Sequence, residues 1–234
     1  MDSRVPEIRK HLKKKLDAYR YEHTLGVEFT CQALAMRYGY DLDKADLAGL
    51  LHDSAKRFEN PVMLQKCLDR GIPVTAEEER DPSLLHAKLG AWMAENKYGV
   101  DDPEILSAIT CHTTGKPGMS LLDKILYVAD YIEPRRSKAA NLPEMRKLAF
   151  IDLDQACFEI MESILEYLKS TGCQIDPMTE AACQDMRRVV SEKQKETAGA
   201  AGETDQDKEE QSVESVKRNG KACSRGFGRE KRRR

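Results

Sequence analysis

The chain has 234 residues, of which 40% are hydrophobic, and its formal net charge at pH 7 is −2. This length and apolar fraction are enough for one large domain or two small ones with a real core. The near-neutral charge implies no dedicated nucleic-acid or membrane partner. The first 15 residues are charged, which argues against a signal peptide, and no run of about 18 apolar residues predicts a transmembrane helix.

The cysteines indicate a reducing environment. There are seven of them, widely scattered along the chain, and none belongs to a CxxC pair. This spacing argues against both a zinc ribbon and a thioredoxin-type site. We interpret these cysteines as reduced thiols, mostly packed in the core, and expect the protein to be cytoplasmic.

Apolar residues recur at three- and four-residue spacing through most of the chain, which predicts an all-α protein without strands. Gly39 and Gly99 are expected to end helices, and Ser120 with Asp123 forms a capping-box pattern. A similar pattern begins at Thr75, in a segment too polar to place. The expected helices cover approximately residues 5–16, 21–38, 42–56, 61–70, 83–98, 103–112, 121–132, 153–170 and 178–193.

The composition changes near residue 196, where hydrophobic residues nearly vanish. Such a segment buries too little apolar surface to offset the entropy of ordering it, so we expect 196–234 to be a disordered tail after a helical domain over 1–195. The tail ends in a basic run over 217–234. Two interpretations of this run stay open: a contact with RNA or ribosomes, and a solvated end without a dedicated partner.

The most informative motif is the pair His52-Asp53, which follows the apolar residues Leu50 and Leu51. Burying an imidazole and a carboxylate there is costly unless something pairs with them, and a metal ion is the usual partner. Adjacent helical residues point about 100° apart, so both can reach one ion only over the helix end. A third and a fourth ligand must then come from other helices.

Two residues are suitable as those further ligands. His23 lies on the inward face of its expected helix, and Asp130 lies near the end of another. Mixed imidazole and carboxylate ligands suit Fe(II), Mn(II) or Zn(II) better than Ca(II). Each residue taken alone also has a structural explanation: His23 could be an ordinary hydrogen-bonding histidine, and Asp53 a surface carboxylate.

Several polar residues near this pair are candidates for phosphate chemistry. Asp53 could both ligate an ion and act as a general base toward water. Lys56, one turn later, could neutralise phosphate charge, or be a solvated lysine at a helix end. Arg136 follows Pro134 and could bind a phosphate through its guanidinium. The glycine-containing loop after His112 could add backbone amides.

At this point the motifs resemble a known family. Their order and spacing are similar to the HD-domain metal-dependent phosphohydrolases, and most closely to the YqeK-type bacterial HD proteins, which are symmetrical diadenosine-tetraphosphate hydrolases. The resemblance covers about residues 5 to 190. The stretches that carry it are RYEHTLGV at 20–27, AGLLHDSAK at 48–56, AITCHTTG at 108–115 and YVADYIEPRR at 127–136.

The resemblance implies an all-helical HD bundle and a divalent metal, with iron favoured over manganese, cobalt or zinc. The implied metal ligands are His23, His52, Asp53 and Asp130. The implied nucleotide and phosphate contacts are Arg20, Asp53, Ser54, Ala55, Lys56, His86, His112, Thr113, Thr114 and Arg136. Other HD branches bind a second ion with residues like His86 and His112, and we favour one ion over two here. A homodimer is expected from the resemblance alone.

The expected function is metal-dependent cleavage of diadenosine tetraphosphate into two ADP by an activated water. Asp53 and Lys56 are the expected catalytic residues. Three alternatives stay open: an HD phosphohydrolase acting on another nucleotide, a nucleotide-sensing module with an RNA-contacting tail, and a purely structural helical protein. The partner expected for the enzyme is a small dinucleoside polyphosphate, with no membrane partner.

Overall fold

The computed structural model describes residues 2–197, and this part of the chain is helical without any strand, which confirms the all-α prediction. A compact unit spans Met1–Val189, and a second unit begins at Val190. None of the described helices is long and apolar enough to span a lipid bilayer. Most of the expected tail, from residue 198, lies outside the described residues.

The helices are α1 Val5–Lys15, α2 Ala18–Tyr38, α3 Leu42–Leu51, α4 Asn60–Leu68, α5 Ala76–Arg80, the 3₁₀ helix η1 Pro82–Leu84, α6 Leu85–Tyr98, α7 Pro103–Cys111, α8 Leu121–Ile132, α9 Leu142–Leu148, α10 Leu153–Thr171 and a helix over 177–197.

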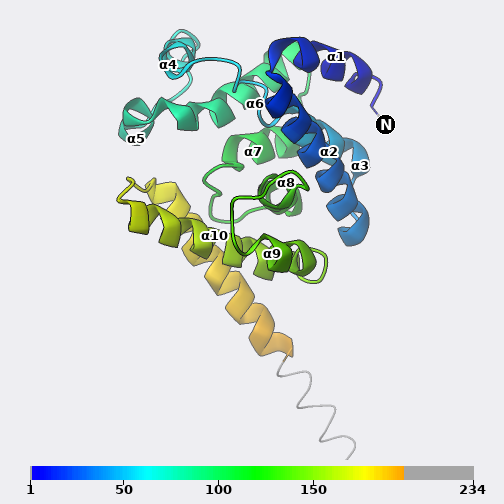
Figure 1. Ribbon diagram of the computed structural model, residues 1–234, viewed down its shortest axis with the longest axis vertical. Helices are drawn as coiled ribbons and strands as arrows, with labels where there is room; N and C mark the ends of the chain where they lie inside the picture. Colours follow the sequence, from blue (N-terminus) through cyan, green and yellow to red (C-terminus); the bar gives the residue numbers. More distant parts are fainter. Residues whose placement is uncertain (1, 198–234) are drawn as a thin grey trace, which may run out of the picture. The chain divides into compact units, whose positions relative to one another are not determined.

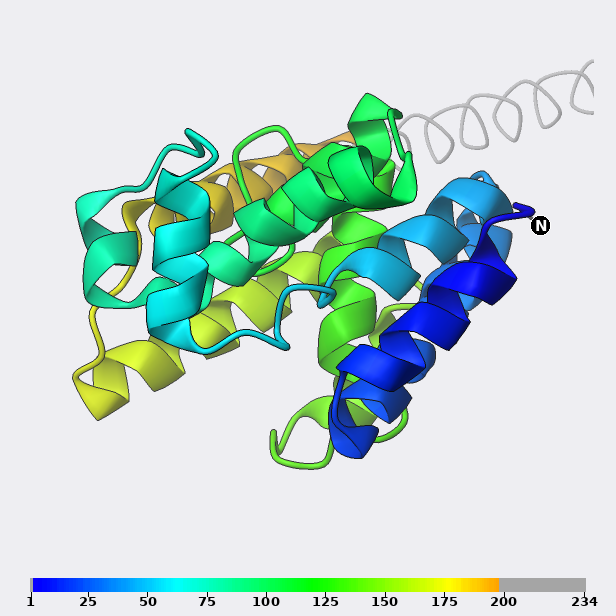
Figure 2. The ribbon, with the colours of Figure 1, turned by 90° about the horizontal axis from the view of Figure 1, so that it is seen from above.

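Helix α8 lies at the centre of the compact unit, where it packs against α2, α3, α7, α9 and α10 (Figure 1). Its sequence explains this position, because Leu122, Ile125, Leu126 and Val128 are completely buried. Helices α4 and α6 pack together beside this bundle (Figure 2) and share a smaller apolar cluster. Packing around α8 therefore brings the ends of several helices to one place.

The predicted helix ends are largely confirmed. Gly39 and Gly99 have φ values of 67° and 66°, in the left-handed region where glycine carries no steric cost, and each ends its helix. Thr75 and Ser120 both form capping boxes with the acidic residue three positions later. The six described cysteines are all free, in agreement with the reduced-thiol interpretation.

Three elements differ from the prediction. Helix α2 begins at Ala18 because Asp17 caps it, with its side chain accepting a hydrogen bond from the Arg20 amide. Helix α3 ends at Leu51, and residues 52–57 continue in turns closed by hydrogen bonds between residues three apart. Helix α9 was not predicted; it has seven residues with a proline in its first turn, too short to show helical periodicity.

A buried polar cluster lies between α1, α2 and α3. The Glu28 side chain is completely buried and receives hydrogen bonds from the Arg9 guanidinium, with Nε 2.9 Å from Oε1. Asp46, also buried, accepts a hydrogen bond from Gln32 at 2.7 Å. Burial and a hydrogen bond with Asp46 raise the pKa of Glu28 from its usual 4.5 to about 8. One guanidinium therefore faces two buried carboxyl groups, and the Glu28 carboxyl keeps its proton to a higher pH than usual.

This cluster predicts how stability depends on pH. Between about pH 4.5 and 8 the folded Glu28 retains a proton that the unfolded chain releases, so stability decreases as pH rises through this window. We expect Glu28→Gln to flatten the decrease in unfolding temperature within this pH window, measured by circular dichroism. Glu22→Gln, on an exposed face of the same helix, is the control and should retain the wild-type slope. Equal slopes for the wild type and Glu28→Gln would contradict the prediction.

Candidate metal centre

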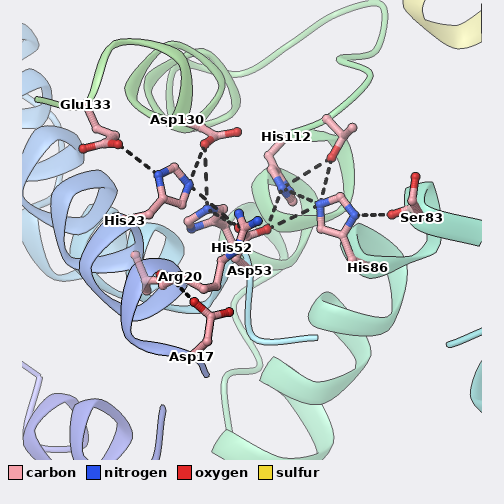
Figure 3. Close-up of polar contacts among 12 residues, drawn as sticks. Asp17, Arg20, His23, His52, Asp53, Ser83, His86, His112, Asp130 and Glu133 are labelled. Carbon is pink, nitrogen blue, oxygen red and sulfur yellow. Dashed lines mark hydrogen bonds and ion pairs between the residues drawn. The ribbon is translucent and has the colours of Figure 1, made fainter. Parts of the chain in front are cut away.

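Four candidate ligands from three helices converge on one point (Figure 3). His23 extends from α2, Asp130 from the last turn of α8, and the pair His52-Asp53 follows the end of α3. The Nε2 atom of His23 is 3.0 Å from Asp130 Oδ1 and 3.8 Å from Asp53 Oδ2. The Nε2 atom of His52 is 3.5 Å from Asp53 Oδ2. Because the backbone turns after Leu51, the adjacent His52 and Asp53 face the same point.

The other ring nitrogen of each histidine is already engaged. Nδ1 of His52, His86 and His112 lies 2.6 to 2.7 Å from a backbone carbonyl oxygen three residues earlier in the chain. A carbonyl can only accept, so Nδ1 donates its proton and Nε2 retains its lone pair in the neutral ring. The local backbone therefore directs the three Nε2 lone pairs toward the centre.

The donor set fits a divalent cation. The Nε2 atoms of His23 and His52 are buried and form no hydrogen bond within the described part of the chain. Buried polar atoms rarely stay unpaired, and a lone pair facing a carboxylate oxygen at 3.0 Å is repulsive unless a proton or a metal cation lies between them. His23, His52 and Asp130 each offer a ligand atom, and these atoms lie within 4.8 Å of one another. Nitrogen and carboxylate donors of this kind suit a transition metal.

A second pair of histidines lies on the other side of Asp53 (Figure 3). The Nε2 atoms of His86 and His112 are 3.1 Å apart, and both lie within 3.8 Å of Asp53 Oδ1. The Thr113 hydroxyl is 3.2 Å from His86 Nε2. Burial, together with the neighbouring imidazoles, lowers the pKa of His86 to about 3 and of His112 to about 4. Both rings are therefore neutral, and their acceptor nitrogens face one another.

Three cationic side chains surround the centre. Arg20 forms an ion pair with Asp53 at 2.7 Å, and Arg136 forms one with Asp130 at 2.7 Å. Lys56 has no ion pair within 4.0 Å among the described residues, although it lies close enough for Asp53 and the two arginines to affect its pKa. Burial lowers that pKa. An unpaired, half-buried ammonium beside two carboxylates leaves a positive charge for an anionic ligand.

Three of the predicted nucleotide contacts do not belong to the group of side chains that meet at the centre: Ser54, Ala55 and Thr114. The Ser54 and Ala55 side chains are completely buried, and Ala55 belongs to the smaller apolar cluster with α4 and α6. Any contact of these two residues with a nucleotide would thus use backbone atoms. Thr114 lines a cavity beside the centre, and its hydroxyl donates to the Gly115 carbonyl at 3.0 Å.

Glu133 is a site residue that the sequence analysis missed. It is buried, and its Oε1 is 3.1 Å from Nδ1 of His23, so it orients that ring as the carbonyls orient the others. Its Oε2 accepts a hydrogen bond from the Arg135 amide. A Cβ atom on Gly26 would lie 2.4 Å from this Oε2, so any larger residue there would force the carboxylate to move. The sequence did contain a signal for this residue: Glu133 is acidic, and it stands between Ile132 and Pro134 directly after an apolar helix.

Comparison with known proteins identifies the family. Residues 20–135 match the model of the HD domain. A symmetrical bis(5'-nucleosyl)-tetraphosphatase of Bacillus subtilis (strain 168) is 40% identical over 168 residues, covering 72% of this chain and 89% of the relative. The chain belongs to the HD-domain family. Membership of this family implies a divalent-metal-dependent hydrolase, in agreement with the donor set.

A further relative and a solved structure support the assignment. A symmetrical bis(5'-nucleosyl)-tetraphosphatase of Halalkalibacterium halodurans is 38% identical over 174 residues, covering 73% of this chain and 90% of the relative. A crystal structure from Clostridium acetobutylicum, described as a predicted HD superfamily hydrolase involved in NAD metabolism, has a TM-score of 0.76 and 37% identity. It covers 78% of this chain and 96% of that one. The relationship thus extends over most of the described residues.

Proposed function

We propose that this protein hydrolyses diadenosine tetraphosphate symmetrically, adding water across the central bridge to yield two ADP. The observation that carries the proposal is the pair of buried, unpaired Nε2 atoms of His23 and His52 beside two carboxylates. The relatives that bear the name symmetrical bis(5'-nucleosyl)-tetraphosphatase support the substrate, since they are 33 to 40% identical over most of the chain.

We propose that one divalent ion, iron, is held by His23, His52, Asp53 and Asp130. When bound, such an ion supplies Lewis acidity toward a phosphoryl oxygen and toward water. The nitrogen and oxygen donors suit iron and also fit manganese, cobalt or zinc. One ion is favoured over two because the Thr113 hydroxyl lies beside the second histidine pair and can donate its proton to one of the two Nε2 atoms.

Asp53 is proposed to accept the proton of the attacking water. Its Oδ2 is engaged by Arg20 at 2.7 Å, whereas, among the described ionisable residues, only His86 and His112 lie within 4.0 Å of its Oδ1. Oδ1 is therefore the oxygen free to act as a base toward a water between the two histidine pairs. Arg20 holds the carboxylate in this orientation.

Lys56 and Arg136 are proposed to neutralise the charge of the tetraphosphate. Lys56 brings an ammonium without an ion-pair partner among the described residues, and Arg136 extends from the loop after α8. Charge that develops on the departing phosphate oxygen is stabilised most by donors that are already in place. The Thr113 hydroxyl, which lies beside His86 and His112, is proposed to donate a hydrogen bond to a phosphate oxygen.

The test is a product analysis. The purified protein, loaded with Fe(II) or Mn(II) under reducing conditions, is incubated with diadenosine tetraphosphate, and the products are separated by anion exchange. ADP as the only nucleotide product supports the proposal. Formation of ATP and AMP would mean asymmetric cleavage, and absence of products from metal-loaded protein would refute the substrate.

Lys56→Met provides a prediction within the same assay. The methionine retains the length of the side chain but removes its charge, so we expect a decrease of about 100-fold in kcat/KM with ADP still the sole product. Lys66→Met, on α4, is the control and should leave the rate unchanged. A wild-type rate for Lys56→Met would remove this residue from the mechanism.

Three further expectations rest on the sequence and the family. We propose that the protein acts in the cytoplasm and forms a homodimer. We also propose that any contact with RNA is confined to the basic run over 217–234, which lies outside the described residues.

A further inference from the structure

The loop between α8 and α9 carries two residues of the site, Glu133 and Arg136. Helix α8 ends at Ile132 because Pro134 follows Glu133, and a residue before proline favours the extended region, where Glu133 has a ψ of 148°. The chain then turns, and the Arg136 amide donates a hydrogen bond to the Glu133 carbonyl at 3.0 Å. The position of this turn therefore decides where the Arg136 side chain meets Asp130.

The turn over 133–136 is held by one arginine of α9. The Nε atom of Arg146 donates a hydrogen bond to the Ile132 carbonyl at 2.9 Å. Its Nη2 atom donates to the carbonyls of Glu133 and Arg136, at 2.9 and 2.8 Å. All three acceptors belong to the backbone, so these bonds fix the path of the chain. Because one nitrogen binds the first and the last carbonyl of the turn, its two ends are held together.

The same guanidinium supplies a charge that the end of α8 lacks. The last carbonyls of a helix have no partner within the helix, and their partial negative charge favours a nearby cation. The last turn of α8 contains no basic residue, and it contains Asp130, whose carboxylate adds further negative charge. Arg146 therefore binds carbonyls at this helix end and offsets the negative charge there.

Helix α9 gives Arg146 a fixed base, although it has only seven residues. Leu142 and Met145 of this helix are buried, and the helix packs against α8 and α10 (Figure 1). Just before the helix, Asn141 accepts a hydrogen bond from the Tyr131 hydroxyl of α8 at 2.7 Å. These contacts attach α9 to α8, so the guanidinium is held at a defined place beside the turn.

We propose that Arg146 is a positioning residue for Arg136: by holding the turn over 133–136, it keeps the Arg136 guanidinium where a phosphate of the substrate binds. The inference rests on the proposed function, in which Arg136 neutralises the charge of the tetraphosphate. Arg136 lines the cavity that borders His23 and Asp130, whereas Arg146 does not. Arg146 therefore acts on the reaction through the backbone of the loop.

The decisive experiment is a double-mutant cycle between Arg146 and Arg136, measured as kcat/KM for diadenosine tetraphosphate at saturating metal. Arg146→Ala alone is expected to lower kcat/KM about tenfold, since small displacements of a substrate-positioning group are costly. In an Arg136→Ala background the same substitution should change kcat/KM by no more than about twofold, because the group that it positions is absent. Losses that multiply independently in the double variant would overturn the inference.

Arg37→Ala is the matched control. Arg37, on α2, also donates a hydrogen bond from its Nε atom to a backbone carbonyl, that of Phe150, at 2.6 Å. Phe150 follows α9 and lies outside the turn over 133–136. We therefore expect this variant to retain the wild-type kcat/KM. A loss equal to that of Arg146→Ala would overturn a specific role for Arg146.

Amide hydrogen exchange of the metal-free protein gives a readout that does not depend on activity. The amides of Arg135 and Arg136 should exchange about tenfold faster in Arg146→Ala, since hydrogen bonds to a charged group contribute on this scale. They should be unchanged in Arg37→Ala. Unchanged exchange in Arg146→Ala would overturn the inference. If the wild type does not hydrolyse diadenosine tetraphosphate, the proposed function fails, and the exchange rates still decide whether Arg146 holds the turn.

Discussion

Replacing Asp53 by asparagine is expected to lower the rate of hydrolysis by about three orders of magnitude. The amide has the same shape, but it cannot accept a proton and carries no charge for a cation. Asp53 is the residue that the four histidines of the site face, with Nε2 distances of 3.5 to 3.8 Å to its two carboxylate oxygens. The measurements are kcat/KM for diadenosine tetraphosphate and the bound metal per chain.

Asp46→Asn is the matched control for this experiment. Asp46 is also a buried aspartate, 2% exposed, and it lies on α3 before the His-Asp pair. Its partners are Gln32, Arg9 and Glu28, and it does not reach the centre. We expect the control to retain its metal and most of its activity. Similar losses in both variants would show that Asp53 acts through the stability of the fold.

Glu133→Gln is expected to weaken metal binding by about 10- to 100-fold, because partners that orient a ligating histidine contribute on this scale. The glutamine can still contact His23, but without the charge that strengthens the basicity of its ring. The affinity is measured by competition with a chelator, and activity should recover when metal is added in excess. Activity that stays low at saturating metal would instead place Glu133 in the chemical step.

Gly26→Ala tests the same contact from the other side. The added methyl group would lie 2.4 Å from Glu133 Oε2 and must displace the carboxylate from His23. We expect weaker metal binding without any change in charge. Glu22→Gln, an exposed position on the same helix, should leave the affinity unchanged.

The sequence predicted most helices because their ends carry local signals. Gly39 and the Ser120 capping box act within a few residues, and the structure has both. The end of α3 could not be predicted in this way, since no glycine or proline marks Leu51. The turns after it form where His52 and Asp53 face side chains from other helices, which is a tertiary effect.

The same distinction between local signals and tertiary contacts decides which residues of the candidate site could be predicted. Residues of ligand type, such as His23 and Asp130, could be selected because imidazole and carboxylate side chains are conspicuous among apolar neighbours. Glu133 was missed because its role depends on a contact with a residue 110 positions away. The burial of Ala55 in a separate apolar cluster likewise depends on how α4 and α6 pack, which helical periodicity does not specify.

The histidines are oriented in two different ways, and this has a consequence for how the site forms during folding. His52, His86 and His112 take their orientation from carbonyls three residues earlier, so these rings are preset as soon as the local turns form. His23 instead depends on Glu133, and its ring is set only when α2 meets α8. An ion that joins His23 to Asp130 would connect residues more than a hundred positions apart, and because the unfolded chain has no preformed site, the free energy of binding would add to the stability of the fold. Removing the metal would then lower the free energy of unfolding, although every apolar contact of the core would still be present.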